Sequence, residues 1–270
     1  MKKYRIISTV LIVINLLMIA ASATNIPDNL SDEEILALIR TGAGYYLGEG
    51  VPEDEFQTAR WTSGTNATHQ YITAYGFGIL QNEKANVYNW YSSHGALTTV
   101  VEYSDWPDAH EIGLALRHHF YYVDTGENGN TTHASTMFVN HYNTAVQHYA
   151  NGNTTEAFRF LGKALHYLED ASTPVHTSST MYANVAHASY ESVVNNNLSR
   201  FSADFTLLYT SYSQMSLSAI VPDVAAFAYS MLPETPFTDS SILSSADTAV
   251  PRAMKNVAAI LNRFYLDVNA

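Results

Sequence analysis

The sequence predicts an all-α protein with a single multi-helix domain, and three observations support this prediction. Apolar residues recur at helical spacing in most segments after residue 60, no strand-rich region follows them, and histidine–carboxylate pairs four residues apart match the period of a helix. The chain of 270 residues also has no cysteine, so disulfides do not contribute to its stability. Its stability must then come from its core or from bound metal ions.

Residues 1–23 have the pattern of a signal peptide. A basic start, MKKYR, precedes an apolar run that ends in the small residues ASA. We therefore expect a secreted protein. Retention as an uncleaved membrane anchor is the alternative, because the apolar run is near the lower length limit for spanning a bilayer.

Residues 24–60 are predicted to be a pro-segment or an N-terminal extension. Ser31 and Glu34 form a capping box ahead of an apolar-periodic helix, which Gly42 ends. A polar, acidic link follows. This segment is either a short helix packed on the main domain or a removable pro-segment. Trp61, the residue after Arg60, favours the pro-segment.

From residue 61 the chain predicts a succession of helices. A loop leads into an apolar helix that ends near residue 83. Asn153 and Glu156 are expected to cap the start of another helix. Further helical stretches cover 84–101, 134–150, 187–198, 200–216, 222–232 and 242–267. Pro251 is expected to be tolerated only in the first turn of the last helix.

The densest chemistry lies between residues 166 and 191. His166 and Asp170 are four residues apart, and so are His187 and Glu191, so each pair projects from one helix face with roughly 6 Å of rise between its members. His176 lies between the two pairs. Three imidazoles and two carboxylates exceed what a solvated helix face needs. Each pair is suited to hold one metal ion.

These motifs resemble those of the bacterial zinc-dependent phospholipase C family, which includes the clostridial alpha-toxin catalytic domain and is related to the S1/P1 nucleases. The order His-x3-Asp-x5-His followed by His-x3-Glu matches the family signature. Trp61 resembles the family's amino-terminal tryptophan, whose amine and carbonyl bind zinc once a pro-peptide is removed. His69 resembles the histidine beside it. The resemblance implies an all-α catalytic domain over residues 61–270.

The resemblance also implies three zinc ions and nine ligands. One ion takes Asp108, His119, His166 and Asp170, a second takes His176, His187 and Glu191, and a third takes Trp61, His69 and the other oxygen of Asp170. His119 is assigned from the run His119-Phe120-Tyr121, with His118 as the competitor. Asp108 is assigned from Trp-Pro-Asp, with Asp105 as the alternative.

Histidine and carboxylate ligands suit zinc, and zinc sites with fewer than four protein ligands leave room for water or substrate. Zinc activates water and neutralises charge on phosphorus, so a phosphodiester is the natural substrate. Asp108, next to the nucleophile, is the candidate catalytic residue that orients or deprotonates it. The expected activity is a phospholipase C that forms diacylglycerol and a phosphorylated head group, with phospholipid, and a membrane surface, as partners.

Two other functions compete with this one. An S1/P1-type single-strand nuclease usually carries Asp at the position of Glu191 and has disulfides, whereas this chain has no cysteine. Its formal net charge of −12 and the absence of a basic patch disfavour nucleic acid as a partner. A non-catalytic surface protein stabilised by zinc is the third possibility, and an open coordination position argues against it. No protein partner is implied.

Overall fold

The computed structural model describes residues 24–25, 30–43, 45–47, 68–126, 133–204, 212–233 and 235–270. Its elements within these ranges are β1 (Thr24–Asn25), α2 (Asp32–Ile39), β2 (Tyr45–Tyr46), α3 (Thr68–Glu83), α4 (Ala85–Ser93), α5 (Leu97–Tyr103), α6 (Trp106–His110), η1 (Gly113–His119), α7 (Ala134–Ala150), α8 (Thr154–Ala171), η2 (Pro174–His176), α9 (Met181–Asn195), η3 (Leu198–Arg200), α10 (Leu217–Tyr229) and α11 (Asp239–Val268). The all-α prediction is confirmed, because these parts contain only two strands, each of two residues.

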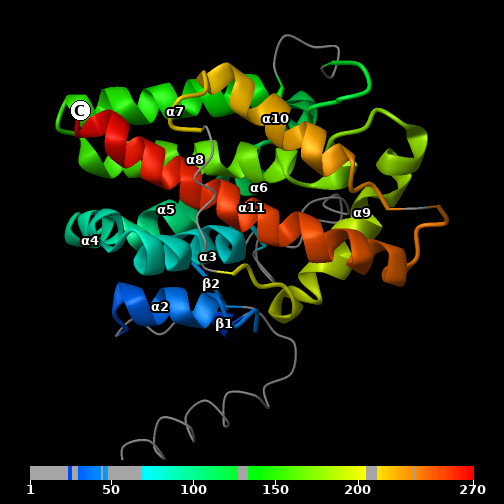
Figure 1. Ribbon diagram of the computed structural model, residues 1–270, viewed down its shortest axis with the longest axis horizontal. Helices are drawn as coiled ribbons and strands as arrows, with labels where there is room; N and C mark the ends of the chain where they lie inside the picture. Colours follow the sequence, from blue (N-terminus) through cyan, green and yellow to red (C-terminus); the bar gives the residue numbers. More distant parts are fainter. Residues whose placement is uncertain are drawn as a thin grey trace, which may run out of the picture.

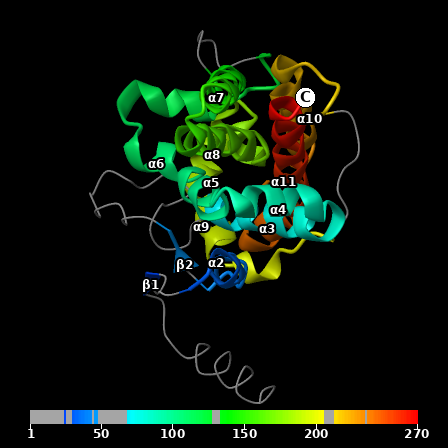
Figure 2. The same ribbon diagram turned by 90° about the vertical axis from the view of Figure 1, so that its left-hand side faces the viewer.

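The helices surround one apolar core. Helices α7 and α8 run side by side, and α11 packs across α3, α8 and α9 (Figure 1). Turning the molecule by 90° places α6 on one side and α10 and α11 on the other, with α8 and α5 between them (Figure 2). Burial of the apolar faces of these helices in a shared core is the main source of stability for such a bundle.

Helix α3 is buried on nearly all sides. Tyr71, Ile72 and Phe77 from this helix have at most 1% of their surface exposed. Gly76 allows α11 to approach closely, because a Cβ at that position would lie 2.5 Å from Cγ1 of Val257. The start of α3 is therefore held firmly, and it carries His69.

Helix α8 forms a hairpin with α7 through a turn at Gly152, whose φ is +78°. Gly162 in the middle of α8 lets the backbone of α5 come near, since a Cβ there would lie 2.6 Å from the carbonyl oxygen of Val100. Asn153 is the N-cap residue of α8, as predicted, but the predicted side-chain contacts of this cap are absent. Asn153 makes no side-chain capping hydrogen bond, and Glu156 pairs with Arg159 at 2.6 Å instead.

Three other predictions about helices need correction. The stretch 84–101 contains two helices, because Gly95 breaks it with a φ of +59°. Residues 201–204 and 212–216 are not helical, which contradicts the helix expected over 200–216. Pro251 lies well inside α11. A proline inside a helix costs about 3 kcal/mol, and the many buried side chains along α11 offset this cost.

The N-terminal segment packs on the main domain. The capping box of Ser31 and Glu34 is present, and α2 buries Leu36 and Ile39 in the common core. The side chain of Gln70 in α3 makes two hydrogen bonds with the backbone of Leu47, at 2.7 and 2.8 Å. Residues 1–23, the link 48–60 and Trp61 lie outside the described residues, so the domain boundaries remain predictions.

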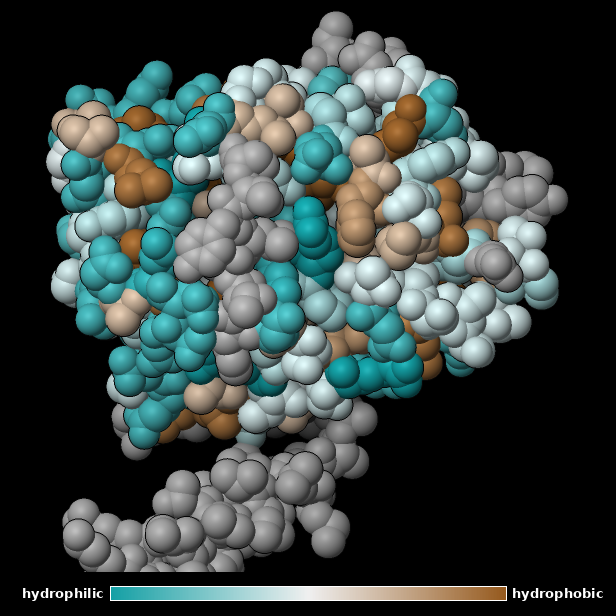
Figure 3. Space-filling model, in the orientation of Figure 1, coloured by the Kyte–Doolittle hydropathy of each residue, from teal (hydrophilic) through white to brown (hydrophobic). Residues whose placement is uncertain are grey.

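On the face seen in Figure 3, hydrophobic residues lie in small groups between hydrophilic ones. Scattered apolar side chains of this kind are normal on a protein surface. Among the helices that the structure describes, none has both the length and the apolar character needed to cross a bilayer.

Candidate metal centre

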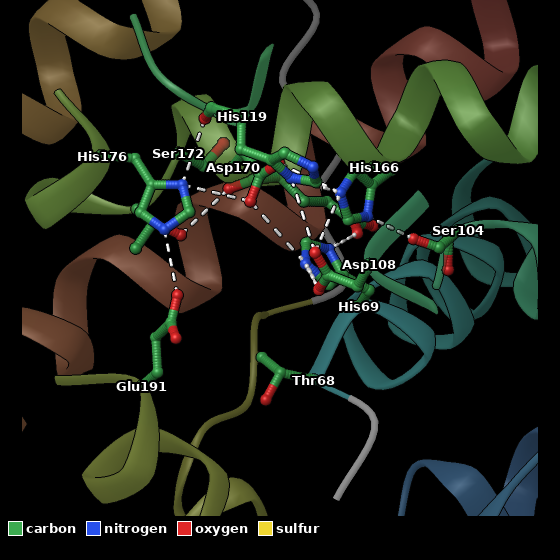
Figure 4. Close-up of polar contacts among 12 residues, drawn as sticks. Thr68, His69, Ser104, Asp108, His119, His166, Asp170, Ser172, His176 and Glu191 are labelled. Atoms are coloured by element: carbon green, nitrogen blue, oxygen red, sulfur yellow. Dashed lines mark hydrogen bonds and ion pairs between the residues drawn. The ribbon is translucent and has the colours of Figure 1, made fainter. Parts of the chain in front are cut away.

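Eight of the nine predicted ligands come together in one buried cluster. They are carried by the start of α3, by α6, by the end of η1, by α8, by η2 and by α9. Figure 4 shows the side chains of His119, His166 and His176 pointing toward Asp170, with Glu191 next to His176. The eight residues are His69, Asp108, His119, His166, Asp170, His176, His187 and Glu191. The ninth, Trp61, lies outside the described residues.

Asp170 is the centre of this cluster. Its Oδ2 lies 2.8 Å from Nδ1 of His119 and 3.1 Å from Nε2 of His166. Its Oδ1 lies 3.2 Å from Nδ1 of His176 and 3.8 Å from Nε2 of His69. The two oxygens therefore face different histidines, which is the arrangement that a carboxylate shared by two metal ions needs.

A second group forms where η2 meets α9. Oε1 of Glu191 lies 3.0 Å from Nε2 of His176 and 2.8 Å from Nε2 of His187. His187 and Glu191 lie one turn apart on the same helix, as their spacing predicted. The other oxygen of Glu191, Oε2, is buried and has no hydrogen-bond partner in the described part of the chain. A buried polar atom of this kind calls for a missing partner such as an ion.

The backbone brings the residues of η1 and η2 together although they are far apart in sequence. The amide of Tyr121 donates to the carbonyl of His176 at 3.1 Å, and the amide of Val123 donates to the carbonyl of Thr177 at 2.8 Å. Asp124 accepts hydrogen bonds from the backbone and side chain of Ser179 just beyond. These contacts hold the segment after His119 against the segment that carries His176.

Asp108, rather than Asp105, faces the histidines. Oδ1 of Asp108 lies 3.5 Å from Nδ1 of His119 and 3.6 Å from Nε2 of His166, and its Oδ2 lies 3.5 Å from Nε2 of His69. Asp105 belongs to none of the possible metal-binding groups in the described residues. Burial and the neighbouring Asp108 raise the pKa of Asp105 to about 7.

Outer contacts orient two of the histidines. Nδ1 of His166 lies 2.8 Å from the carbonyl of Ser104, so it is the nitrogen that donates and Nε2 is turned toward Asp170 (Figure 4). Nδ1 of His69 lies 2.7 Å from Oε2 of Glu169. Metal-binding histidines usually donate their second ring nitrogen to a carbonyl or carboxylate in this way.

Sequence reasoning missed two carboxylates at this site. Glu169 is fully buried, and its Oε1 also accepts a hydrogen bond from Thr73 at 2.6 Å. Its position three residues after His166, on the same helix face, was the available signal. Glu111 lies 3.4 Å from Nε2 of His119 and accepts a hydrogen bond from Tyr167. Glu111 follows Asp108 by three residues.

His118, the competitor of His119, is only partly buried and lies 3.4 Å from Glu111 through Nδ1. It belongs to none of the candidate metal groups in the residues that the structure describes.

The buried charges determine the protonation of the cluster in the absence of a metal. Burial opposes ionisation of Asp170, but the charges of His166, His119 and His176 hold its pKa well below the usual range. Burial also opposes protonation of His119, but the charge and hydrogen bond of Asp170 raise its pKa to about 10. Burial lowers the pKa of His166. The carboxylates of this cluster therefore favour positive charge next to Asp170.

The residues present fit zinc. Three groups each offer ligand atoms within 4.8 Å of one another. They are His69, His166 and Asp170; Asp108, His119 and His166; and His176, His187 and Glu191. Imidazole nitrogens and carboxylate oxygens, with outer carbonyls and carboxylates behind them, are the donors that zinc sites use.

A cavity of about 180 Å³ gives access to the cluster. Asp108, Asp170 and Glu191 line it together with Leu116 and Phe120. The ring of Phe120 stacks on His176 at 4.8 Å between centroids. A substrate that enters this cavity meets carboxylates and imidazoles together with the apolar side chains of Leu116 and Phe120.

Comparison with solved structures shows a similar fold in clostridial toxins. The alpha-toxin of Clostridium perfringens from an avian strain aligns with a TM-score of 0.63 at 20% identity, covering 74% of this chain and 63% of the toxin chain. The alpha toxin of Clostridium absonum aligns with a TM-score of 0.65, with the same identity and coverage.

A bacterial phospholipase C is similar in sequence. A phospholipase C from Paraclostridium bifermentans is 31% identical over 149 residues, which cover 47% of this chain and 37% of the relative. This chain thus matches little more than a third of that relative's length. The model of the family described as zinc dependent phospholipase C matches residues 60–234, a range that includes all nine predicted ligands. Because this match covers more than half of the chain, the protein belongs to the zinc-dependent phospholipase C family.

Proposed function

We propose that this protein is a phospholipase C that hydrolyses a phospholipid to diacylglycerol and a phosphorylated head group. The observation that carries the proposal is the carboxylate of Asp170, whose two oxygens face histidines of separate groups and which lines a cavity. The family match and the phospholipase C from Paraclostridium bifermentans support it.

Three zinc ions would occupy the cluster. Asp108, His119, His166 and Asp170 would hold one ion, His176, His187 and Glu191 a second, and Trp61, His69 and Asp170 the third. Bound zinc would supply Lewis-acid activation of water and of the phosphodiester.

The chain's own groups position the reactants. Asp108 lines the cavity beside His119 and Asp170, where its carboxylate can accept a proton from the attacking water and orient it. The two oxygens of Asp170 fix the spacing between neighbouring histidines. Phe120 and Leu116 give the cavity an apolar wall, which suits the glycerol and acyl portion of a lipid.

Secretion and processing belong to the same proposal. The signal-like residues 1–23 would direct export, and cleavage after Arg60 would free the amine of Trp61 for zinc. The family match begins at residue 60, which supports this boundary. Mass spectrometry of the protein recovered from the medium tests it, since an N-terminus at Trp61 is expected.

The decisive experiment is hydrolysis by the purified protein after removal of metal and again after addition of zinc. Phosphatidylcholine, phosphatidylethanolamine and single-stranded DNA are offered in parallel. Diacylglycerol that appears only with zinc, with the DNA intact, is the expected result. Cleaved DNA with intact lipid would overturn the proposal in favour of a nuclease, and no turnover with fully bound zinc would favour a structural role for the metal.

A further inference from the structure

An exposed apolar segment, residues 112–116, includes one side chain that lines the cavity. Ile112 and Leu114 have 77% and 78% of their surface exposed, and Leu116 has 36% exposed. Leu266 in α11 is the one other large hydrophobic residue that is exposed in the described part of the chain. Three of four such side chains therefore lie within five consecutive residues, in and just before η1.

This segment is continuous with the cavity. Leu116 and His119 both belong to η1, and both line the cavity. The segment that follows α6 lies at the outer edge of the molecule in Figure 2, away from α10 and α11. One end of η1 thus contributes to the metal cluster while the other exposes leucines to the surroundings.

We infer that Ile112, Leu114 and Leu116 form a docking surface that inserts into the surface of a zwitterionic lipid bilayer during catalysis. This inference rests on the proposed function. A phosphodiester must reach the cluster while its acyl chains remain attached, and withdrawing those chains into water is unfavourable. Apolar side chains around the cavity mouth allow the head group to enter while the acyl chains stay in the bilayer.

The charge distribution favours a zwitterionic surface. The chain has a formal net charge of −12, so it is repelled by strongly anionic membranes. The run from Ile112 to His119 contains no carboxylate, although the chain has 25 acidic residues, and it includes the exposed Arg117. Inserting this run into a bilayer therefore removes no carboxylate from water. It also brings a cation near lipid phosphates.

The test uses the zinc-loaded protein and three single variants. Leu114→Ser and Ile112→Ser remove apolar surface from the docking segment without altering a residue that lines the cavity. Leu266→Ser is the matched control, because Leu266 is also exposed but lies in α11. Vesicles are made from a phosphatidylcholine analogue with a methylene group in place of the glycerol oxygen on phosphorus, so the proposed reaction cannot consume them.

Each docking variant is expected to bind these vesicles about tenfold more weakly than the wild type. Leu266→Ser should bind within about twofold. Hydrolysis of monomeric short-chain phosphatidylcholine should be the same for all four proteins, whereas hydrolysis of long-chain vesicles should fall in the two docking variants. Binding should change little with salt, because apolar insertion is not screened.

Equal vesicle binding by Leu114→Ser and Leu266→Ser overturns the inference, and so does a wild type that does not bind vesicles. A wild-type dimer that Leu114→Ser dissociates would assign the surface to a second copy of the chain. Vesicle binding that depends on Leu114, without hydrolysis of either lipid form, would uphold the docking surface and reject the proposed function. The two failures can therefore be distinguished.

Discussion

His69 and Glu169 are joined by a contact of 2.7 Å between Nδ1 and Oε2, and neither side chain is exposed to solvent. The carboxylate occupies the nitrogen of His69 that faces away from Asp108 and Asp170. Nε2 is left on the side of the cluster, 3.5 Å from Asp108. Glu169 is thus placed to select the form of His69 that can bind a metal through Nε2.

Changing Glu169 to Ala is expected to lower the zinc affinity of the site that includes His69 by about 10- to 100-fold. Removing a hydrogen-bond partner of a metal-binding histidine has an effect of this size. The measurement is zinc stoichiometry and affinity by titration with a competing chelator. Glu169→Gln keeps an acceptor oxygen for His69 and should recover part of the affinity. Thr73→Val is the control, because it removes only the other contact of Glu169. Unchanged zinc binding in Glu169→Ala would show that His69 does not depend on this carboxylate.

Asn substitutions at Asp108 and Asp105 should give opposite results. Asp108→Asn removes a carboxylate within 3.6 Å of three histidines. We therefore expect loss of bound zinc and a kcat at least about 100-fold lower, which corresponds to roughly 3 kcal/mol of activation free energy. Asp105→Asn should retain zinc and should not destabilise the protein, because a neutral amide costs less to bury than a carboxylate. Zinc counted by atomic absorption and thermal unfolding provide the comparison. Retained zinc and activity in Asp108→Asn would contradict the assignment.

Replacing Gly162 with Ala should destabilise the protein, although the same change usually strengthens a helix by about 1 kcal/mol. The new Cβ would lie 2.6 Å from the carbonyl oxygen of Val100 and 2.7 Å from Cβ of Tyr103. Helices α8 and α5 must then separate, at a cost of about 1–3 kcal/mol. Chemical denaturation measures the sign of the change, and a more stable variant would mean that the two helices are not so close.

His141 is expected to lower the free energy of unfolding in acid. Burial, followed by the charge of Lys163, lowers its pKa to about 4, and its ring stacks on Tyr167. An unfolded chain binds a proton at this histidine near pH 6.5. The unfolded state therefore binds more protons between these values, and stability is lost as the pH falls from about 6.5 to about 4.

His141→Phe keeps a ring at this position and removes the titration. Denaturation of both proteins at pH 7 and at pH 4.5 should show a larger loss of stability in the wild type than in the variant. Zinc dissociation in acid affects both proteins alike, so the difference between them reports on His141. An equal loss in both would show that His141 titrates normally in the folded state.

Local patterns in the sequence were enough to predict the helical class and the two histidine–carboxylate pairs His166–Asp170 and His187–Glu191, whereas the other ligands were implied by the resemblance to a known family. A spacing of four residues places His187 and Glu191 on one helix face, and apolar periodicity predicts α7 with its observed bounds. The capping box of Ser31 and Glu34 is also a local feature, because both partners lie within one turn. Such features depend on the geometry of a single helix, so no other part of the chain is needed to predict them.

Local periodicity was misleading where distant contacts outweigh it. Pro251 was expected in a first turn but lies inside α11, whose long buried face compensates for the proline. Asn153 makes no side-chain cap, and Glu156 pairs with Arg159 in a competing contact within the same helix. In both cases a longer-range or competing interaction exceeds the local preference.

The sequence by itself determined which residues are suited to bind metal, because residue type and helical period depend only on the chain. Only the tertiary structure decided that Asp108 faces the histidines while Asp105 does not, and that Glu169 contacts His69 across 100 residues. It also decided that Leu116 and Phe120 form the wall of the cavity. These relationships follow from the packing of α8 against α3, α5 and η1, and packing between distant segments leaves no periodic signal in the sequence.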